Sequence, residues 1–309
     1  PPPRNPRRRS MLQALAALPL APMASLSFAE AAEFKVDKRP IPRSGELLPM
    51  VGLGTYQAFG VGPDRSERDP LKEVLRLFVE HGGSLVDSSP MYGTAESVVG
   101  DLADQQGLTP KLFMATKVWT TGRDSGIRQM EESMRRMKVK RMDLMQIHNL
   151  QDWKTHAKTL KEWKAADRIR YTGITHYHSG AYDELERLLK TKEFDFVQFN
   201  YSISEREAEQ SVLPLARDTG TAVIINRPFA QASLFSRVRG KDLPPWTAEF
   251  DCKSWGQFFL KYILSHSAVT CIIPATSKPH HLVDNMGAGF GKLPDAAMRK
   301  KMAEYMDGL

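Results

Sequence analysis

The chain has 309 residues, of which 41% are hydrophobic and 26% are charged. This length and composition argue against a disordered protein and suit one large domain, since a single α/β barrel needs about 250 residues. The formal net charge of +7 is partly due to arginines before residue 32, and aromatic residues are not interleaved with basic ones as on a nucleic-acid surface. We therefore expect a globular protein without a nucleic-acid partner.

Residues 1–31 are typical of a targeting segment. Arg8 and Arg9 precede an apolar stretch rich in Ala and Leu, which ends at the small-residue cleavage pattern Ala29-Glu30-Ala31. This arrangement resembles a bacterial twin-arginine signal, which predicts export by the twin-arginine machinery and a periplasmic location. The stretch is short for a bilayer crossing, so we expect no stable membrane span. A disordered basic tail and an ordinary secretory signal are the alternatives.

Residues 32–309 are predicted to form one domain, in which short apolar runs alternate with longer segments of helical period. Residues 34–49 precede the first run and predict a small hairpin that covers the N-terminal end of a barrel. In one helical segment, Leu71, Val74, Leu75, Phe78 and Val79 share a single face. The eight predicted strands span residues 50–53, 84–87, 112–117, 142–148, 171–175, 196–200, 222–226 and 269–273.

This alternation predicts parallel strands covered by helices. Eight strand–helix units favour a closed (β/α)₈ barrel over an open doubly wound sheet. The first strand is not followed by the glycine-rich G-x-G-x-x-G pattern of open dinucleotide-binding sheets. Cys271 falls in the eighth predicted strand and is expected to be an inert buried thiol, and a disulfide with Cys252 is not expected.

Three ionisable residues stand at the ends of consecutive predicted strands: Asp87, Lys117 and His148. The active sites of such barrels lie at the C-terminal ends of the strands. One such residue alone would be read as a solvated lysine or a hydrogen-bonded core histidine. Charged groups are costly to bury unless they are paired, so three together indicate a functional site. The other strands end in further polar residues, namely Thr55, Tyr56, Thr175, His176, Gln198, Arg227 and Thr276.

Four motifs resemble those of the aldo-keto reductases. Residues 86–100, VDSSPMYGTAESVVG, are similar to the family signature, in which Asp and Tyr stand five apart and are followed by Gly and Glu. Residues 114–119 resemble its lysine strand, and residues 143–148 its histidine strand. Residues 272–279, together with Asn285, resemble its phosphate-binding segment. The motifs occur in the family's order, and the resemblance runs from about residue 34 to the C-terminus.

The resemblance implies hydride transfer between NADP(H) and the carbonyl carbon of an aldehyde or ketone, in either direction. Tyr92 is then the general acid, and Lys117 lowers the pKa of its phenol. Asp87 pairs with Lys117 and keeps it charged. His148 donates a hydrogen bond to the carbonyl oxygen of the substrate. The cofactor carries the hydride, so no metal is required.

The resemblance also implies the cofactor contacts. Thr175 and His176 match a Ser-Asn pair that holds the nicotinamide carboxamide, and Gln198 matches a third contact to it. Arg227 follows Asn226 where many members have an aromatic residue, and its guanidinium can stack on the nicotinamide. The remaining expected contacts lie at the end of the first strand and around the adenosine 2′-phosphate and adenine, namely Thr55, Tyr56, Asp87, Thr276, Ser277, Lys278, His281 and Asn285.

Two other functions remain as alternatives. The first is a regulatory barrel that holds a nucleotide without turnover, although the complete set of Asp87, Tyr92, Lys117 and His148 argues against it. The second is a metal-dependent barrel hydrolase, which the spacing of His176 and His178 suggests. Such hydrolases usually carry the H-x-H pair after the first strand, where this chain has Gly54-Thr55-Tyr56.

Overall fold

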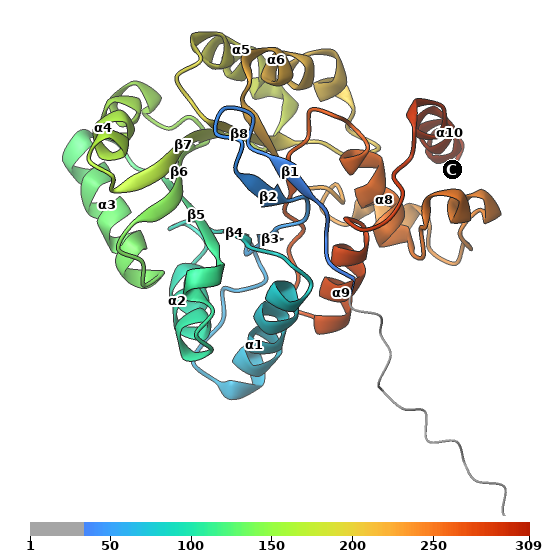
Figure 1. The fold of residues 1–309 in the computed structure, drawn as a ribbon, viewed down its shortest axis with the longest axis horizontal. Coiled ribbons are helices and arrows are strands. Elements are labelled where there is room, and N and C mark those ends of the chain that lie inside the picture. Colours follow the sequence, from blue (N-terminus) through green and yellow to red (C-terminus); the bar gives the residue numbers. More distant parts are fainter. Residues whose placement is uncertain (1–33) are drawn as a thin grey trace, which may run out of the picture. The chain divides into compact units, whose positions relative to one another are not determined.

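Eight parallel strands form the centre of residues 34–309, the part of the chain that the computed structural model describes (Figure 1). Each strand pairs with the next one along the chain. The predicted signal, residues 1–31, lies outside the described residues. The strands are β3 (Leu53–Gly54), β4 (Leu85–Asp87), β5 (Phe113–Val118), β6 (Met142–His148), β7 (Ile169–Thr175), β8 (Phe196–Asn200), β9 (Ala222–Asn226) and β10 (Cys271–Ile272).

The first and last strands meet and close the sheet into a barrel. Parallel bridges join Val51 to Ile272 and Gly54 to Ala275. The Gly52 amide donates to the Ile272 carbonyl at 2.8 Å. A Cβ atom on Gly54 would lie 2.6 Å from the Ile273 carbonyl oxygen, so only glycine allows this approach. The predicted (β/α)₈ barrel is confirmed. The seam, where the first and last strands meet, is formed by isolated bridges, and β3 and β10 are therefore shorter than the predicted strands.

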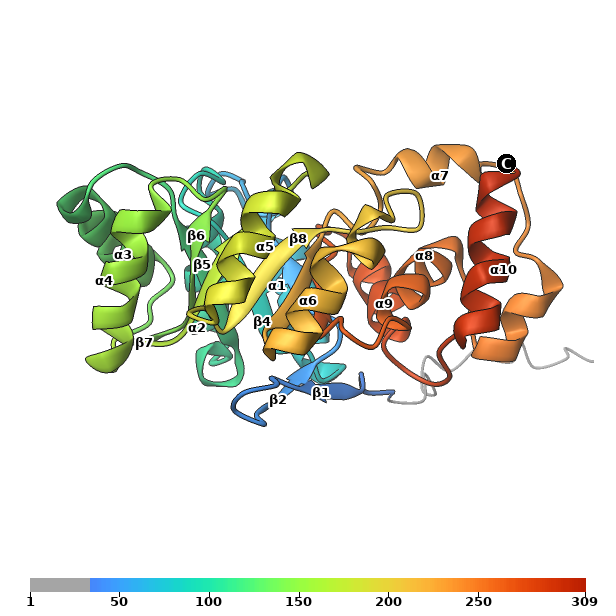
Figure 2. The same cartoon turned by 90° about the horizontal axis from the view of Figure 1, so that it is seen from above.

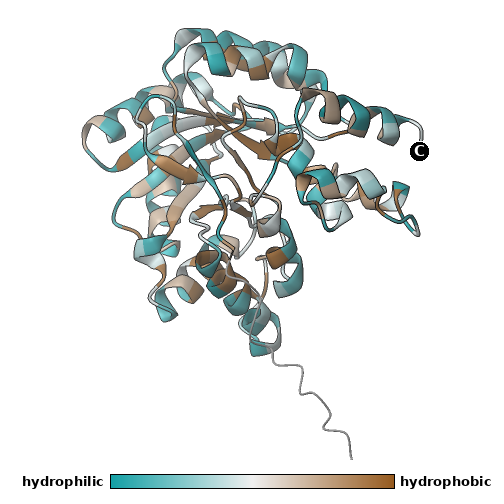
Figure 3. Cartoon of the chain, turned by 45° about the vertical axis from the view of Figure 1, so that its right-hand side comes forward, coloured by the Kyte–Doolittle hydropathy of each residue, from teal (hydrophilic) through white to brown (hydrophobic). Residues whose placement is uncertain are grey.

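Helices surround the barrel (Figure 1), and hydrophobic and hydrophilic residues alternate along them (Figure 3). In α1, Leu71, Val74, Leu75 and Phe78 are fully buried, as their spacing predicts, while Val79 is half-buried at the edge of this face. The helices are α1 (Arg65–Glu80), α2 (Ala95–Gln105), α3 (Arg123–Arg136), α4 (Trp153–Ala165), α5 (Tyr182–Thr191), α6 (Val212–Thr219), α7 (Ser233–Arg237), α8 (Trp255–Leu264), α9 (Pro279–Gly287) and α10 (Ala296–Asp307).

An antiparallel hairpin of β1 (Lys38–Pro40) and β2 (Leu47–Pro49) lies beneath one end of the strands (Figure 2). Its Ile41 and Leu48 are buried in the cluster that fills the N-terminal end of the barrel. The Arg39 guanidinium donates to the carbonyls of Leu264 at 2.6 Å and His266 at 3.2 Å, and also to that of Val269. The hairpin thus binds the last residue of α8, whose carbonyl lacks a helical partner, and the segment that leads from α8 to β10. The predicted hairpin at this end of the barrel is confirmed.

The interior of the barrel changes from apolar to polar along the strands. Side chains two residues apart point to the same face of a strand. On β6, Leu144 lies in the apolar cluster at the N-terminal end, and Gln146 and His148 follow it on the same face. On β4, Leu85 is followed in the same way by Asp87. The polar side chains therefore gather at the C-terminal end of the barrel.

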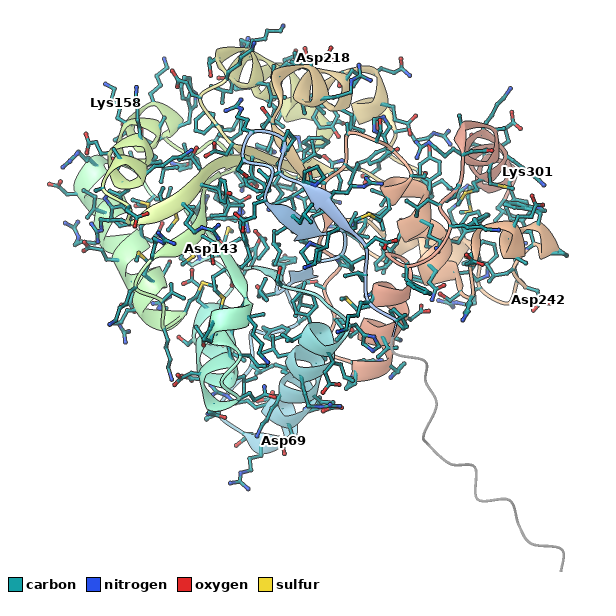
Figure 4. The ribbon with its side chains drawn as sticks, viewed as in Figure 1. Asp69, Asp143, Lys158, Asp218, Asp242 and Lys301 are labelled. Atoms are coloured by element: carbon teal, nitrogen blue, oxygen red, sulfur yellow. The ribbon has the colours of Figure 1, made fainter. Side chains whose placement is uncertain are left out.

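Charged side chains elsewhere lie mainly on the outer helices (Figure 4). Asp69 on α1, Lys158 on α4, Asp218 on α6 and Lys301 on α10 mark this outer margin. Within residues 34–309, none of the helices combines the length and the apolar content that a membrane crossing requires. Cys252 and Cys271 are both buried free thiols.

Candidate active site

A buried ion pair lies at the centre of the polar end of the barrel. Lys117 on β5 is fully buried, and its Nζ donates to Asp87 Oδ2 at 2.5 Å and to the Ser88 carbonyl at 2.7 Å. Burial lowers the pKa of Lys117, but Asp87 and Tyr92 together outweigh this effect and leave the pKa above its usual value. Lys117 is therefore an ammonium ion at neutral pH, and its predicted partner Asp87 is in place.

Two glutamine side chains hold the other oxygen of Asp87. Gln146 Nε2 donates to Asp87 Oδ1 at 2.8 Å, and Gln198 Nε2 donates to it at 3.0 Å. Gln198 Nε2 also lies 3.0 Å from Gln146 Oε1. Gln146 is absent from the sequence-based prediction, although its place two residues before His148 on one strand puts both side chains inside the barrel. These bonds satisfy the carboxylate and fix its orientation toward Lys117.

Tyr92 lies on the loop between β4 and α2, beside the ion pair. Lys117 Nζ is 5.2 Å from the centroid of the Tyr92 ring, and the rings of Tyr92 and Tyr56 are 5.0 Å apart. Burial raises the pKa of Tyr92 above its usual value, and the opposing effect of Lys117 is smaller. Lys117 lowers the pKa of Tyr92 as the sequence predicts, but the pKa as a whole is raised. Burial destabilises the phenolate more than the nearby ammonium stabilises it. At neutral pH Tyr92 holds its proton.

His148 ends β6 and faces Tyr92, with ring centroids 5.8 Å apart and planes 85° to each other. Burial lowers its pKa to about 2, and the nearby charge of Lys117 acts in the same direction. The ring is therefore neutral and carries a proton on only one of its nitrogens. Its Nδ1 lies 3.0 Å from Ser89 Oγ, a contact that the sequence-based prediction did not include.

His176 follows β7 where the resemblance places an amide side chain. Burial lowers its pKa to about 4, with a smaller contribution from His178, so it is neutral at pH 7. Its Nδ1 accepts the Tyr177 amide proton at 3.0 Å. A neutral imidazole carries one ring proton. Because Nδ1 of His176 is an acceptor, that ring proton is on Nε2, and Nε2 can act as a donor. In residues 34–309, His, Cys, Asp and Glu side chains form no group of three or more that could bind a metal ion.

Two buried polar atoms beside His176 have no partner within residues 34–309: Asn226 Oδ1 and Arg227 Nε. Asn226 Nδ2 donates to the His176 carbonyl at 2.9 Å and to Gln198 Oε1 at 3.3 Å. A buried polar atom without a hydrogen bond costs about 1–3 kcal/mol, so a polar ligand that bonds to these atoms would gain that free energy. A carboxamide offers donors and an acceptor, and therefore fits the acceptor on Asn226 and the donor on His176.

The predicted phosphate segment lies between β10 and α9. Thr276 Oγ1 accepts the Lys278 amide proton at 3.1 Å, and α9 begins at the next residue. The side chains of Ser277, Lys278 and His281 are exposed, whereas Asn285 is buried. A cleft of about 510 Å³ runs between this segment and the loop after β3, and its lining includes Gln57, Ala58, Ser277 and Lys278. The segment thus combines a helix N-terminus with an exposed cation, which favours phosphate.

The structure brings most of the other predicted residues to the same end of the barrel. Thr175 is buried and pairs in register with His148. Thr55 is fully buried, and its Oγ1 lies 3.0 Å from the Asp87 carbonyl and from Ser88 Oγ, so it is engaged with the loop that carries Asp87. Tyr56 is 54% exposed beside Tyr92, and its phenol oxygen accepts a hydrogen bond from Gln57 Nε2 at 3.4 Å.

The aldo/keto reductase family model matches residues 50–302 of this chain. The chain belongs to the aldo/keto reductase family. The resemblance recognised in the sequence is therefore confirmed, and this protein is an oxidoreductase of that family.

Two relatives and one solved structure illustrate the similarity. The chain is 28% identical to methylglyoxal reductase YeaE of Escherichia coli (strain K12) over 253 residues, which covers 79% of this chain and 87% of that protein. It is 26% identical to aldo-keto reductase YhdN of Bacillus subtilis (strain 168) over 213 residues, or 64% and 63% of the two chains. An aldo-keto reductase from Klebsiella pneumoniae, solved with NADPH, has 22% identity and a TM-score of 0.74 over 88% of this chain and 95% of its own.

Proposed function

We propose that this aldo-keto reductase uses NADP(H) to reduce an aldehyde or ketone to an alcohol, or to catalyse the reverse reaction, with Tyr92 as the general acid. The observation that supports this best is the buried contact of Lys117 with Asp87, beside Tyr92 and His148. A lysine without solvent exposure is costly to maintain, and the Nζ of this one lies 5.2 Å from the centroid of the Tyr92 ring.

Each of the four residues of the site has a separate role in protonating the carbonyl oxygen. Tyr92 gives its proton to the carbonyl oxygen of the substrate. NADP(H), when bound, would supply the hydride. Lys117 stabilises the phenolate that remains, and Asp87 with the Ser88 carbonyl holds the ammonium in place. His148 is neutral and offers one ring proton to the same oxygen, which positions the substrate.

Cofactor binding is assigned to two groups of residues. His176 Nε2 and Asn226 Oδ1 are complementary to the nicotinamide carboxamide, with Gln198 beside them. Lys278, Ser277 and His281 are assigned to the 2′-phosphate. Solved neighbours of the same fold from Klebsiella pneumoniae contain NADP or NADPH, which supports this choice. A relative described as an NADH-specific methylglyoxal reductase of Escherichia coli (strain K12), 25% identical, makes NADH the competing cofactor.

The proposal is tested by following the absorbance of NADPH and of NADH with purified protein and a panel of small aldehydes and ketones. The panel includes methylglyoxal, because two relatives carry that substrate in their names. We expect consumption of NADPH that depends on the carbonyl compound and exceeds that of NADH. Binding of NADPH without turnover of any member would instead support a barrel that holds a nucleotide.

A further inference from the structure

We propose that Ser89 is a positioning residue that fixes the tautomer of His148, with its hydroxyl donating to Nδ1 and the ring proton held on Nε2. This inference rests on the proposed function for its catalytic meaning, but the tautomer itself is a property of the free protein. Ser89 is fully buried on the loop between β4 and α2, and its Oγ lies 3.0 Å from His148 Nδ1.

The hydrogen bonds of the serine hydroxyl decide the direction of this contact. A hydroxyl has one proton to donate and two lone pairs to accept with. Ser89 Oγ accepts the Met91 amide proton at 3.3 Å, and among residues 34–309 its other partner is His148 Nδ1. If Nδ1 carried the proton, the buried hydroxyl proton of Ser89 would have no acceptor in the described part of the chain. If Ser89 donates, both groups are satisfied, which is the arrangement that buried polar groups adopt.

The consequence concerns the other nitrogen of the ring. His148 is neutral, so a lone pair on Nδ1 requires the proton on Nε2. The Tyr92 ring meets His148 edge to face, with ring centroids 5.8 Å apart. A proton on Nε2 makes His148 a donor to the carbonyl oxygen that Tyr92 protonates, whereas the other tautomer would present a lone pair and repel that oxygen.

Nitrogen-15 NMR of the full chain, labelled on histidine, tests the tautomer without turnover. His148→Gln assigns the resonances. In the wild-type protein we expect an unprotonated Nδ1 and a protonated Nε2. Ser89→Ala should shift both nitrogens toward a mixture of tautomers. Ser88→Ala is the matched control, since it removes a neighbouring buried hydroxyl that contacts Thr55 and not His148. A proton on Nδ1 in the wild type, or unchanged nitrogens in Ser89→Ala, would overturn the proposal.

Kinetics then separate this role from a merely structural one. Loss of one hydrogen bond to a neutral group predicts that kcat of Ser89→Ala falls about threefold to tenfold. The KM for NADPH should stay unchanged, and Ser89→Thr, which keeps a hydroxyl, should restore kcat. A raised KM for NADPH with unchanged kcat in Ser89→Ala would contradict the proposed role of Ser89. If the tautomer is as proposed and the wild type turns over no carbonyl compound, the proposed function fails while the role of Ser89 in holding His148 stands.

Discussion

At the scale of single residues, the site depends on a charge that the barrel buries completely. Lys117 has no exposure to solvent, and its ammonium is held by Asp87 and by the Ser88 carbonyl. Gln146 and Gln198 satisfy the opposite side of the carboxylate. Burial raises the pKa of Tyr92, and Lys117 counteracts only part of this rise. Replacing Lys117 should therefore change the pH dependence of the reaction.

Lys117→Met should lower carbonyl reduction on the order of 100-fold and change the pH profile of alcohol oxidation. Oxidation requires the Tyr92 phenolate, so its rate should rise as the pH approaches the pKa of the phenol, which burial raises above its usual value. Without the ammonium this pKa rises further, so the increase should begin at higher pH. The rate of oxidation is measured across pH 6–11.

Asp87→Asn combined with Lys117→Met is the matched control, because it removes both buried charges and leaves neither unpaired. Breaking such a pair from one side typically costs about 3–5 kcal/mol of folding stability. Urea unfolding of both variants separates loss of fold from loss of chemistry. An oxidation profile in folded Lys117→Met identical to that of the wild type contradicts the role of Lys117.

Lys278→Ala should weaken NADPH binding by about tenfold to 100-fold and leave NADH binding nearly unchanged. A charge-assisted hydrogen bond to phosphate contributes about 1.5–3 kcal/mol, and only NADPH carries the 2′-phosphate. Quenching of tryptophan fluorescence measures both dissociation constants. Lys158→Ala on the outer side of α4 is the control for general charge effects. Equal weakening of both cofactors would place the phosphate elsewhere.

At the scale of elements, the sequence predicts the middle of the barrel better than its seam. The predicted spans 142–148, 196–200 and 222–226 coincide with β6, β8 and β9, each of which pairs with a neighbouring strand on both sides. The first and last strands were predicted as 50–53 and 269–273. Their pairing reduces to bridges at the seam, and the apolar pattern carries no information about which residues form them.

In the site, too, some residues could be predicted from the sequence and others could not. Strand ends and the family motif predicted Asp87, Lys117 and His148, which the structure brings together. Ser89 and the free acceptor of Asn226 were not predicted, because their roles depend on which way a side chain turns and on which partners it lacks. Lys117 lowers the pKa of Tyr92 as predicted, but the larger opposing effect of burial was not foreseen, since burial of a loop residue cannot be judged from its neighbours in the chain.

Arg39→Ala tests the attachment of the hairpin to α8. The guanidinium donates to the carbonyl of Leu264, the last residue of α8, and to two carbonyls of the segment that follows, so its loss should lower the free energy of unfolding by about 2 kcal/mol. Urea unfolding followed by circular dichroism measures the change. Lys38→Ala is the control, because Lys38 is an exposed neighbour on the same strand. Equal stability of Arg39→Ala and Lys38→Ala would show that apolar packing alone holds the hairpin.

At the scale of the whole molecule, the apolar core and the polar site occupy opposite ends of the barrel. Apolar residues of the strands and hairpin fill the N-terminal end, and the polar network occupies the C-terminal end. Residues 1–31 lie outside the described residues, and their export function remains our proposal. A twin-arginine route carries folded proteins, so the barrel would close around NADP(H) before export and retain it in the periplasm.

Replacement of Arg8 and Arg9 together by lysine should leave the precursor in the cytoplasm, because the paired arginines are the signal that we propose the export machinery reads. Fractionation of cells followed by immunoblotting measures the distribution. Unchanged export would reject the twin-arginine interpretation. Protein purified from the periplasm should release NADP(H) on denaturation, and an empty site would reject retention alone.

Tyr92→Phe tests the assignment of the general acid most directly, because it removes one hydroxyl and keeps the ring beside Lys117. NADPH binding is measured by fluorescence, and NADPH oxidation with an aldehyde is followed in the same preparation. We predict unchanged binding and a loss of turnover on the order of 100-fold or more. Turnover by Tyr92→Phe at the wild-type rate would contradict the mechanism and remove Tyr92 from it.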